Sequence, residues 1–171
     1  MSNKPKILIV DDDEAILRQL KWALEEEYQV VTASDKDTAL KAVEREKPQV
    51  IALDVNLNTL NMAGKEGIEL LCAIKLRDPF AKVIMITGNE NKEIALEAVN
   101  RGASDFFLKP IDVNELKVIL KRTLQLQHLE MENKYLQEEI DKKQQFSEMV
   151  GDSPAIEEVF KLMRRVAPTE A

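Results

Sequence analysis

Residues 50–56 read VIALDVN, an apolar run rich in β-branched side chains that ends at a single carboxylate, Asp54. A short apolar run of this kind is typical of a strand that is buried on both faces of a parallel sheet. Its last residue then emerges at the edge of the sheet. Because many strands end in Asp, the functional interest of this run depends on the rest of the chain.

Three further apolar runs also end in polar side chains. They are residues 6–10, followed by Asp11, Asp12 and Asp13; residues 82–86, followed by Thr87; and residues 106–108, followed by Lys109 and Pro110. The carboxyl ends of parallel strands share one edge of a sheet, and open α/β folds bind their ligands there. We therefore expect these carboxylates, the hydroxyl and the ammonium group to form one site.

Helical patterns separate these runs. Apolar residues recur at helical spacing in residues 14–27, 37–46, 66–77 and 92–101, a further helix starts near Asp112, and Gln29–Ala33 has the pattern of a short strand. Trp22 lies off the apolar stripe of the first helix, and we expect it to be partly covered by packing. The alternation of strand and helix predicts an α/β fold with a doubly wound, five-stranded parallel sheet covered on both faces.

Composition limits the classes of function. The 171 residues suffice for one domain and an additional segment, and the net charge of −7 argues against a nucleic-acid-binding surface here. The single cysteine, Cys72, has no partner within the chain, which fits a reducing cytosol. With no signal peptide and no apolar run of membrane-spanning length, a cytoplasmic protein without membrane contact is expected.

The last helix is predicted to continue beyond the domain, because neither Gly nor Pro occurs from Val113 to about residue 145. Steps of three, four, three and four residues join Leu126, Leu129, Asn133, Leu136 and Ile140. This heptad pattern, with Asn133 at an a position, favours a paired, in-register coiled coil. The pattern lasts little more than two heptads, so a solvated helix with a narrow apolar stripe is the alternative to a homodimer.

Ser153 and Pro154 form a good helix start after Gly151, and an apolar helix face without a partner follows it. We expect residues 1–124 to form one domain and residues 125–147 a coiled-coil linker. Residues 148–171 would then begin a further, truncated domain.

The predicted site suits metal-assisted phosphoryl transfer. Asp11, Asp12 and Asp54 offer the oxygen ligands that Mg²⁺ prefers. A carboxylate such as Asp54 can then attack phosphorus to form an aspartyl phosphate. Lys109 would supply a point charge and Thr87 a hydroxyl donor to the transferring group.

The segments ILIVDDDEAIL, VIALDVN, VIMITG and FFLKPID resemble the receiver domain of two-component response regulators, over residues 6–126. The resemblance implies phosphorylation by a sensor histidine kinase, a flavodoxin-like strand order 2-1-3-4-5 and a cis peptide between Lys109 and Pro110. It also implies the following roles: phosphoacceptor Asp54; Mg²⁺ ligands Asp11, Asp12, Asp54 and the Asn56 carbonyl; phosphoryl contacts Thr87 and Lys109; and switch residues Thr87 and Phe106.

Residues 150–169 (VGDSPAIEEVFKLMRRVAPT) resemble the beginning of the AAA+ module of NtrC-type, sigma-54-dependent activators. No phosphate-binding G-x-x-x-x-G-K-[ST] motif occurs in the chain. The resemblance therefore implies the regulatory part of a longer activator, in which RNA polymerase and DNA are contacted only through domains absent here. ITGNEN, FFLKPID and the coil that follows are also similar to the PEP-CTERM-box response regulators.

One segment departs from the family pattern. Asn58 stands where the family usually has Pro, and about five extra residues precede Gly67. Two interpretations remain open: a tolerated loop insertion, since lengthening a loop costs little, or a lid near Asp54 that tunes phosphate access or partner choice.

We therefore expect a phosphorylation-controlled switch and not an enzyme. One alternative is a dimerisation module that works without phosphorylation. The other, less favoured alternative is a haloacid-dehalogenase-like phosphatase. That chemistry needs a second Asp two residues after the nucleophile, where this chain has Asn56.

Overall fold

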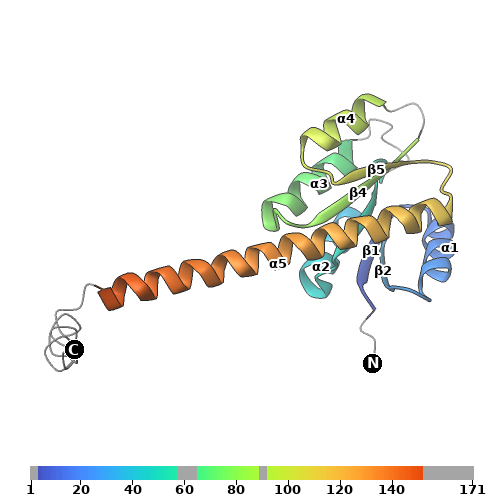
Figure 1. The fold of residues 1–171 in the computed structure, drawn as a ribbon. Helices are drawn as coiled ribbons and strands as arrows, with labels where there is room; N and C mark the ends of the chain where they lie inside the picture. The colour runs from blue at the N-terminus through green and yellow to red at the C-terminus, as the bar shows by residue number, and fades with distance from the viewer. Residues whose placement is uncertain (1–3, 58–64, 89–91, 152–171) are drawn as a thin grey trace, which may run out of the picture. The chain divides into compact units, whose positions relative to one another are not determined.

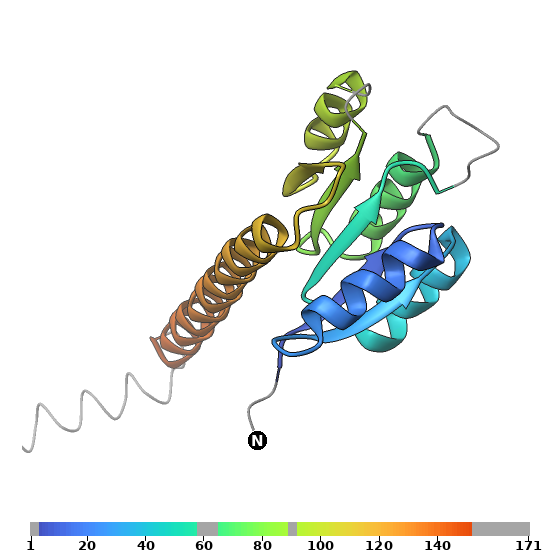
Figure 2. The ribbon, with the colours of Figure 1, turned by 90° about the vertical axis from the view of Figure 1, so that its right-hand side faces the viewer.

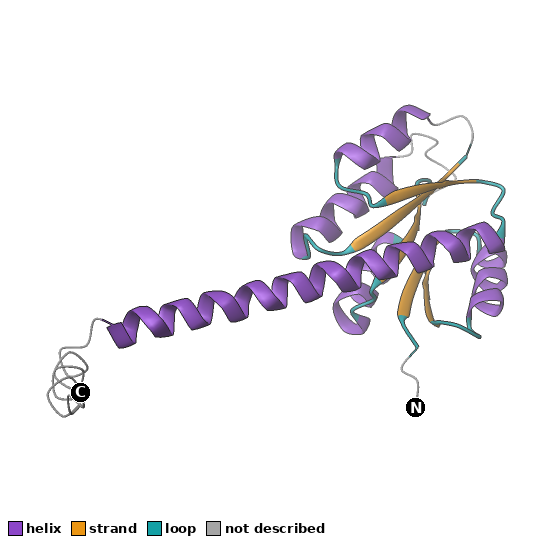
Figure 3. Cartoon of the chain, viewed as in Figure 1, coloured by secondary structure: helices purple, strands orange, loops and turns teal. Residues whose placement is uncertain are grey.

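The computed structural model describes residues 4–57, 65–88 and 92–151 (Figure 1). Strands and helices alternate along these residues, as the sequence predicts (Figure 3). The elements are β1 (Lys6–Val10), α1 (Glu14–Leu24), β2 (Gln29–Ala33), α2 (Lys36–Glu46), β3 (Val50–Asp54), α3 (Lys65–Arg77), β4 (Lys82–Thr87), α4 (Lys92–Asn100), β5 (Asp105–Leu108) and α5 (Val113–Gly151).

The five strands form one parallel sheet in the order β2-β1-β3-β4-β5, which confirms the predicted fold class and strand order. Every residue of β3 and β4 is buried. This burial explains why the two strands are apolar on both faces rather than alternating. The sheet places the ends of β1 and β3 side by side, since Val10 is in register with Leu53.

Helices cover both faces of the sheet (Figure 2). One core contains buried side chains of α2, α3 and α4, for example Ala39, Leu71 and Ala98. The other contains buried side chains of α1 and the first turns of α5, for example Leu20 and Leu116. This doubly wound arrangement leaves the carboxyl edge of the sheet free for a site.

Short polar side chains fix the starts of three helices. Asp13 accepts a hydrogen bond from the Ala15 amide at the start of α1, and Asp35 and Thr38 form a reciprocal capping box on α2. Asp112 accepts from the amides of two residues in the first turn of α5. Helix α5 starts four residues after Lys109, at the edge where the site is expected.

Two expectations from the sequence are corrected in detail. Helix α1 ends at Leu24 rather than at residue 27, because the amides of Glu27 and Tyr28 both turn back to the Leu24 carbonyl and Tyr28 is buried. Trp22, expected to be partly covered, is 79% exposed, because its position lies outside the buried face of α1.

Helix α5 extends to Gly151, the residue after which the sequence predicts a new helix start. The chain divides into two compact units, residues 1–127 and 128–171, and the boundary falls within α5. Leu126, Leu129, Asn133, Leu136 and Ile140 are all exposed. Residues 152–171, including the helix start predicted at Ser153, lie outside the described residues. Within the described part of the chain, no helix is long and apolar enough to cross a membrane.

Candidate functional site

Three acidic side chains meet at the carboxyl edge of the sheet. Asp11 and Asp12 directly follow β1, and Asp54 is the last residue of β3. Each offers a carboxylate oxygen within 4.8 Å of those of the other two. Asp11 and Asp54 are buried, and Asp12 is half-buried. A set of carboxylate oxygens this close, partly open to solvent, suits a hard divalent cation such as Mg²⁺.

Lys109, just beyond β5, supplies the balancing positive charge. Its Nζ lies 2.6 Å from Asp54 Oδ2 and 3.1 Å from Asp11 Oδ2. The backbone holds this residue in place, because the Lys109 amide donates to the Thr87 carbonyl at 2.8 Å. The peptide bond to Pro110 is cis, as the resemblance implies.

Local backbone bonds orient the two buried carboxylates. Asp11 Oδ1 accepts from the amide of Asp13 at 2.9 Å, and Asp54 Oδ1 accepts from the amide of Asn56 at 3.2 Å. In both residues the second oxygen, Oδ2, is thus the one that faces Lys109. The carboxylates are therefore held in fixed orientations before any ligand binds.

Burial and charge act against each other in this cluster. Burial raises the pKa of the Asp54 carboxyl above its ordinary value, and the nearby Asp11 charge adds to this, although Lys109 and the Asn56 amide oppose it. Burial alone would lower the pKa of Lys109. Its contacts with Asp54 and Asp11 outweigh burial, so the pKa of Lys109 also lies above its ordinary value. The site is thus short of positive charge, which is what a bound cation would supply.

Thr87 and Phe106 lie on the strands beyond β3. The Thr87 side chain is buried at the end of β4, and its hydroxyl donates to the Gly88 carbonyl at 3.3 Å. Asp54 is in register with Ile86, so Thr87 follows directly beside the site. Phe106 lies on the edge strand β5 and is exposed.

Asn56 carries a polar atom that the sequence pattern did not reveal. Its side-chain Oδ1 is buried and has no hydrogen-bond partner within the described residues. Buried acceptors are nearly always paired. The Asn56 oxygen is an exception to this rule. Asp13, the third acid after β1, caps α1 instead of joining the cluster.

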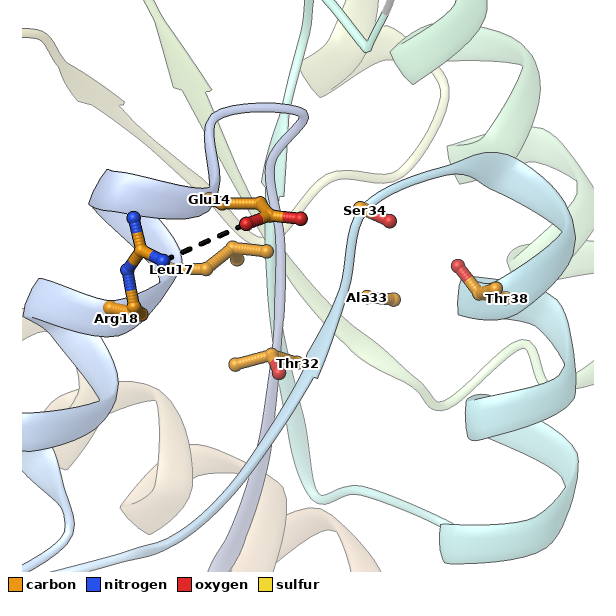
Figure 4. A pocket seen from close by; sticks show the side chains of 7 residues that line it. All are labelled: Glu14, Leu17, Arg18, Thr32, Ala33, Ser34 and Thr38. Carbon is orange, nitrogen blue, oxygen red and sulfur yellow. Dashed lines mark ion pairs between the residues drawn. The ribbon is translucent and has the colours of Figure 1, made fainter.

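A separate hollow lies between α1, β2 and α2 (Figure 4). It measures about 320 Å³ and contains the Glu14–Arg18 ion pair. Its polar side chains are exposed, and none of the predicted site residues lines it. We assign it no role.

The fold and the edge cluster define an α/β domain in which three carboxylates meet at the carboxyl edge of the sheet, one of them a buried aspartate paired with a lysine. Residues 7–121 match the family model described as "Response regulator receiver domain". The chain belongs to this family, whose members serve as phosphoacceptor domains in two-component signalling.

Relatives place it more narrowly among the NtrC and NtrX type of response regulator. The chain is 37% identical over 166 residues to the nitrogen assimilation regulatory protein NtrX of Azorhizobium caulinodans, covering 96% of this chain and 35% of that protein. It is 30% identical over 167 residues to the regulatory protein AtoC of Escherichia coli, covering 97% and 35%. This chain therefore spans about a third of the length of these relatives.

Solved structures agree with this placement. The crystal structure of the receiver domain of NtrX from Brucella abortus has a TM-score of 0.64 at 36% identity, covering 70% of this chain and 98% of that one. A longer NtrX chain from the same organism gives a TM-score of 0.70 at 33% identity, covering 96% and 35%.

Proposed function

We propose that Asp54 is the phosphoacceptor of a phosphorylation-controlled switch and receives its phosphoryl group from a sensor histidine kinase. The observation that carries the proposal is the buried Asp54 carboxylate, with Lys109 Nζ 2.6 Å away and two further carboxylates beside it. In the transfer, a bond forms from an Asp54 oxygen to phosphorus as the bond from phosphorus to the donor imidazole nitrogen breaks.

We propose that Asp11, Asp12, Asp54 and the backbone carbonyl of Asn56 hold Mg²⁺. When bound, the ion neutralises the carboxylates and the oxygens of the transferring group. The protein contributes the position of the reacting groups. The Asn56 amide orients the Asp54 carboxylate, and Lys109 lies next to the same carboxylate. Positioning and charge stabilisation account for most of the catalysis of phosphoryl transfer.

The switch itself would use Thr87, Lys109 and Phe106. Thr87 donates to a backbone carbonyl now, and a phosphoryl oxygen on Asp54 would offer its hydroxyl a charged acceptor in exchange. Lys109 would likewise move from Asp54 Oδ2 toward the new charge. Because Phe106 is exposed on β5, it has room to change its packing when Thr87 moves.

The test is to incubate the chain with Mg²⁺ and acetyl phosphate and to measure its intact mass. We expect one phosphoryl adduct, absent without Mg²⁺ and absent in Asp54→Asn. Asp37→Asn, which changes an exposed carboxylate on α2, is the matched control and should be phosphorylated normally. An adduct that persists in Asp54→Asn argues against the proposal. Rapid turnover of a generic phosphate ester would instead support the phosphatase alternative.

We also propose that residues 125–147 form a homodimeric coiled coil. The apolar side chains at its a and d positions are exposed along α5, so within the described residues they lack the cover that a second copy would give. Sedimentation should show a dimer that Leu129→Glu dissociates, while His128→Glu, at a neighbouring exposed position, leaves it intact. Repeating the measurement with beryllofluoride separates the mechanisms, since an unchanged dimer favours a module that works without phosphorylation.

Residues 148–171 would lead into an AAA+ domain. The resemblance of residues 150–169 and the threefold greater length of the relatives support this part of the proposal. Contacts with RNA polymerase and DNA would belong to the domains that follow. Membership of the PEP-CTERM-box subgroup and a cytoplasmic location stay predictions.

A further inference from the structure

Gly67, in the first turn of α3, lies unusually close to the backbone at the end of β3. A Cβ atom at this position would lie 2.6 Å from the Asp54 carbonyl oxygen and 2.6 Å from the Cα and carbonyl oxygen of Val55, whereas ordinary contacts measure 3.4–4 Å. All three neighbours are backbone atoms, so no side chain can rotate to make room. The helix can approach β3 this closely only because residue 67 has no side chain.

A hydrogen bond accompanies this approach. The Gly67 amide, one of the first amides of α3 and so without a partner in its own helix, donates to the Val55 carbonyl at 3.1 Å. The Val55 amide in turn donates to the Ile86 carbonyl of β4 at 2.9 Å. Hydrogen bonds to α3 and to β4 therefore hold the backbone of Val55 from both sides.

The same short stretch of backbone aims the Asp54 carboxylate. The amide of Asn56 holds Asp54 Oδ1, which leaves Oδ2 facing Lys109. A shift of the backbone at Val55 would carry both the Asp54 side chain and the Asn56 amide with it. The position of α3 thus affects the geometry of the cluster although α3 supplies none of its acids.

We propose that Gly67 is a positioning residue for phosphoryl transfer: its missing side chain lets α3 press on the backbone of residues 54 and 55, and this contact fixes Asp54 relative to Asp11 and Lys109. This inference rests on the proposed function and adds a residue to it. Twelve residues separate Asp54 from Gly67 in this chain. A longer connection restrains the positions of its two ends less. The contact between Gly67 and the backbone of β3 therefore does more to hold Asp54 in place than it would with a shorter connection.

The size of the effect follows from the distances. To reach ordinary contact, Gly67→Ala must part α3 and β3 by roughly 0.8 Å. Misplacing a reacting group by about 1 Å lowers rates by up to about 100-fold. We therefore expect the variant to take up phosphoryl groups from acetyl phosphate between about 10-fold and 100-fold more slowly, and to bind Mg²⁺ more weakly.

The experiment compares the full chain carrying Gly67→Ala with Ala73→Gly, which lowers the helix propensity of the same helix six residues further on. Phosphoryl uptake is measured by intact mass over a range of acetyl phosphate concentrations, Mg²⁺ affinity by calorimetry, and thermal unfolding by circular dichroism. The proposal expects the maximal rate of Gly67→Ala to fall while Ala73→Gly, of similar unfolding temperature, keeps the wild-type rate. Equal rates of phosphoryl uptake in Gly67→Ala and the wild type would overturn the proposal. So would a fall in the uptake rate of both variants in proportion to their loss of stability.

Hydrogen exchange of the wild type keeps the test decisive if Gly67→Ala fails to fold. The Gly67 amide should exchange more slowly once Mg²⁺ and beryllofluoride are bound, because a fixed Asp54 then holds the Val55 carbonyl in place. An unchanged exchange rate contradicts the proposal. A wild-type chain that takes up no phosphoryl group defeats the proposed function itself, whereas normal uptake by Gly67→Ala defeats only the role of Gly67.

Discussion

Lys109→Met removes the cation that lies between two buried carboxylates. Lys109 Nζ contacts Asp54, which is 3% exposed, and Asp11, which is fully buried. Breaking a buried ion pair by removing one partner costs roughly 3–5 kcal/mol, because the remaining charge is left uncompensated. The Lys109 side chain is itself 29% exposed, so we expect the lower end, about 3 kcal/mol, in the absence of divalent cations.

Lys117→Met is a matched control for this change. Lys117 Nζ also lies 2.6 Å from a carboxylate oxygen, that of Glu27, and the Lys117 side chain is 28% exposed. The two pairs differ in the acid, because the Glu27 side chain is 52% exposed. Exposed ion pairs contribute little to stability. Lys117→Met should therefore lower the free energy of unfolding far less than Lys109→Met.

Urea unfolding followed by circular dichroism measures both variants, first with EDTA and then with Mg²⁺. Mg²⁺ should recover part of the stability that Lys109→Met loses, because the ion restores positive charge among the carboxylates. The loss should also shrink as the pH falls through the raised pKa of Asp54, since a protonated carboxyl no longer needs a counter-charge. Equal losses in the two variants, or a loss in Lys109→Met that neither Mg²⁺ nor acid reduces, would refute this account of the cluster.

Three further predictions concern other parts of the molecule. Asp12→Ala should weaken Mg²⁺ binding by on the order of 10-fold or more, which calorimetry can measure. Removing even a residue that only supports a metal ligand weakens metal binding by about that factor. Asp35→Ala removes the cap of α2 and should cost about 1 kcal/mol at neutral pH. Hydrogen bonds to Thr38 hold the pKa of the Asp35 carboxyl below its usual value. The stability that this cap contributes is therefore present above the ordinary pKa and is lost as the pH falls through the lowered pKa. Urea unfolding at several pH values measures this, and a stability difference that did not decline in acid would argue against the cap. Asn133→Leu should strengthen the proposed dimer but relax its register, which sedimentation and cysteine cross-linking would detect as a tighter dimer with several cross-linking partners.

The fold was predictable because the central strands bury both faces. Continuous apolar runs in β3 and β4, each ending at a polar residue, give both the parallel sheet and the edge where Asp54 and Thr87 lie. The ends of helices were less predictable. Residues 25–27 are three Glu, all good helix formers, and only the burial of Tyr28 shows why α1 ends at Leu24.

The members of the site could be predicted from strand ends, but their contacts could not. Sequence alone gives no signal for the distance from Lys109 Nζ to Asp54 or for the approach of Gly67 to β3. Nor does it reveal that Asn56 Oδ1 has no partner within the described part of the chain. These depend on how separate elements pack. Trp22 illustrates the converse, since we expected packing to cover part of this large side chain although it lies off the apolar stripe, and it is exposed.

Chemical mapping of the phosphorylated residue tests the central claim most directly. Borohydride reduces an aspartyl phosphate to homoserine, and peptide mass spectrometry then identifies the position that carried it. After treatment with Mg²⁺ and a phosphohistidine donor or acetyl phosphate, we predict homoserine at position 54 and at no other acidic residue. Homoserine at Asp11 or Asp12, or an intact Asp54 in a chain that has gained a phosphoryl group, would contradict the account.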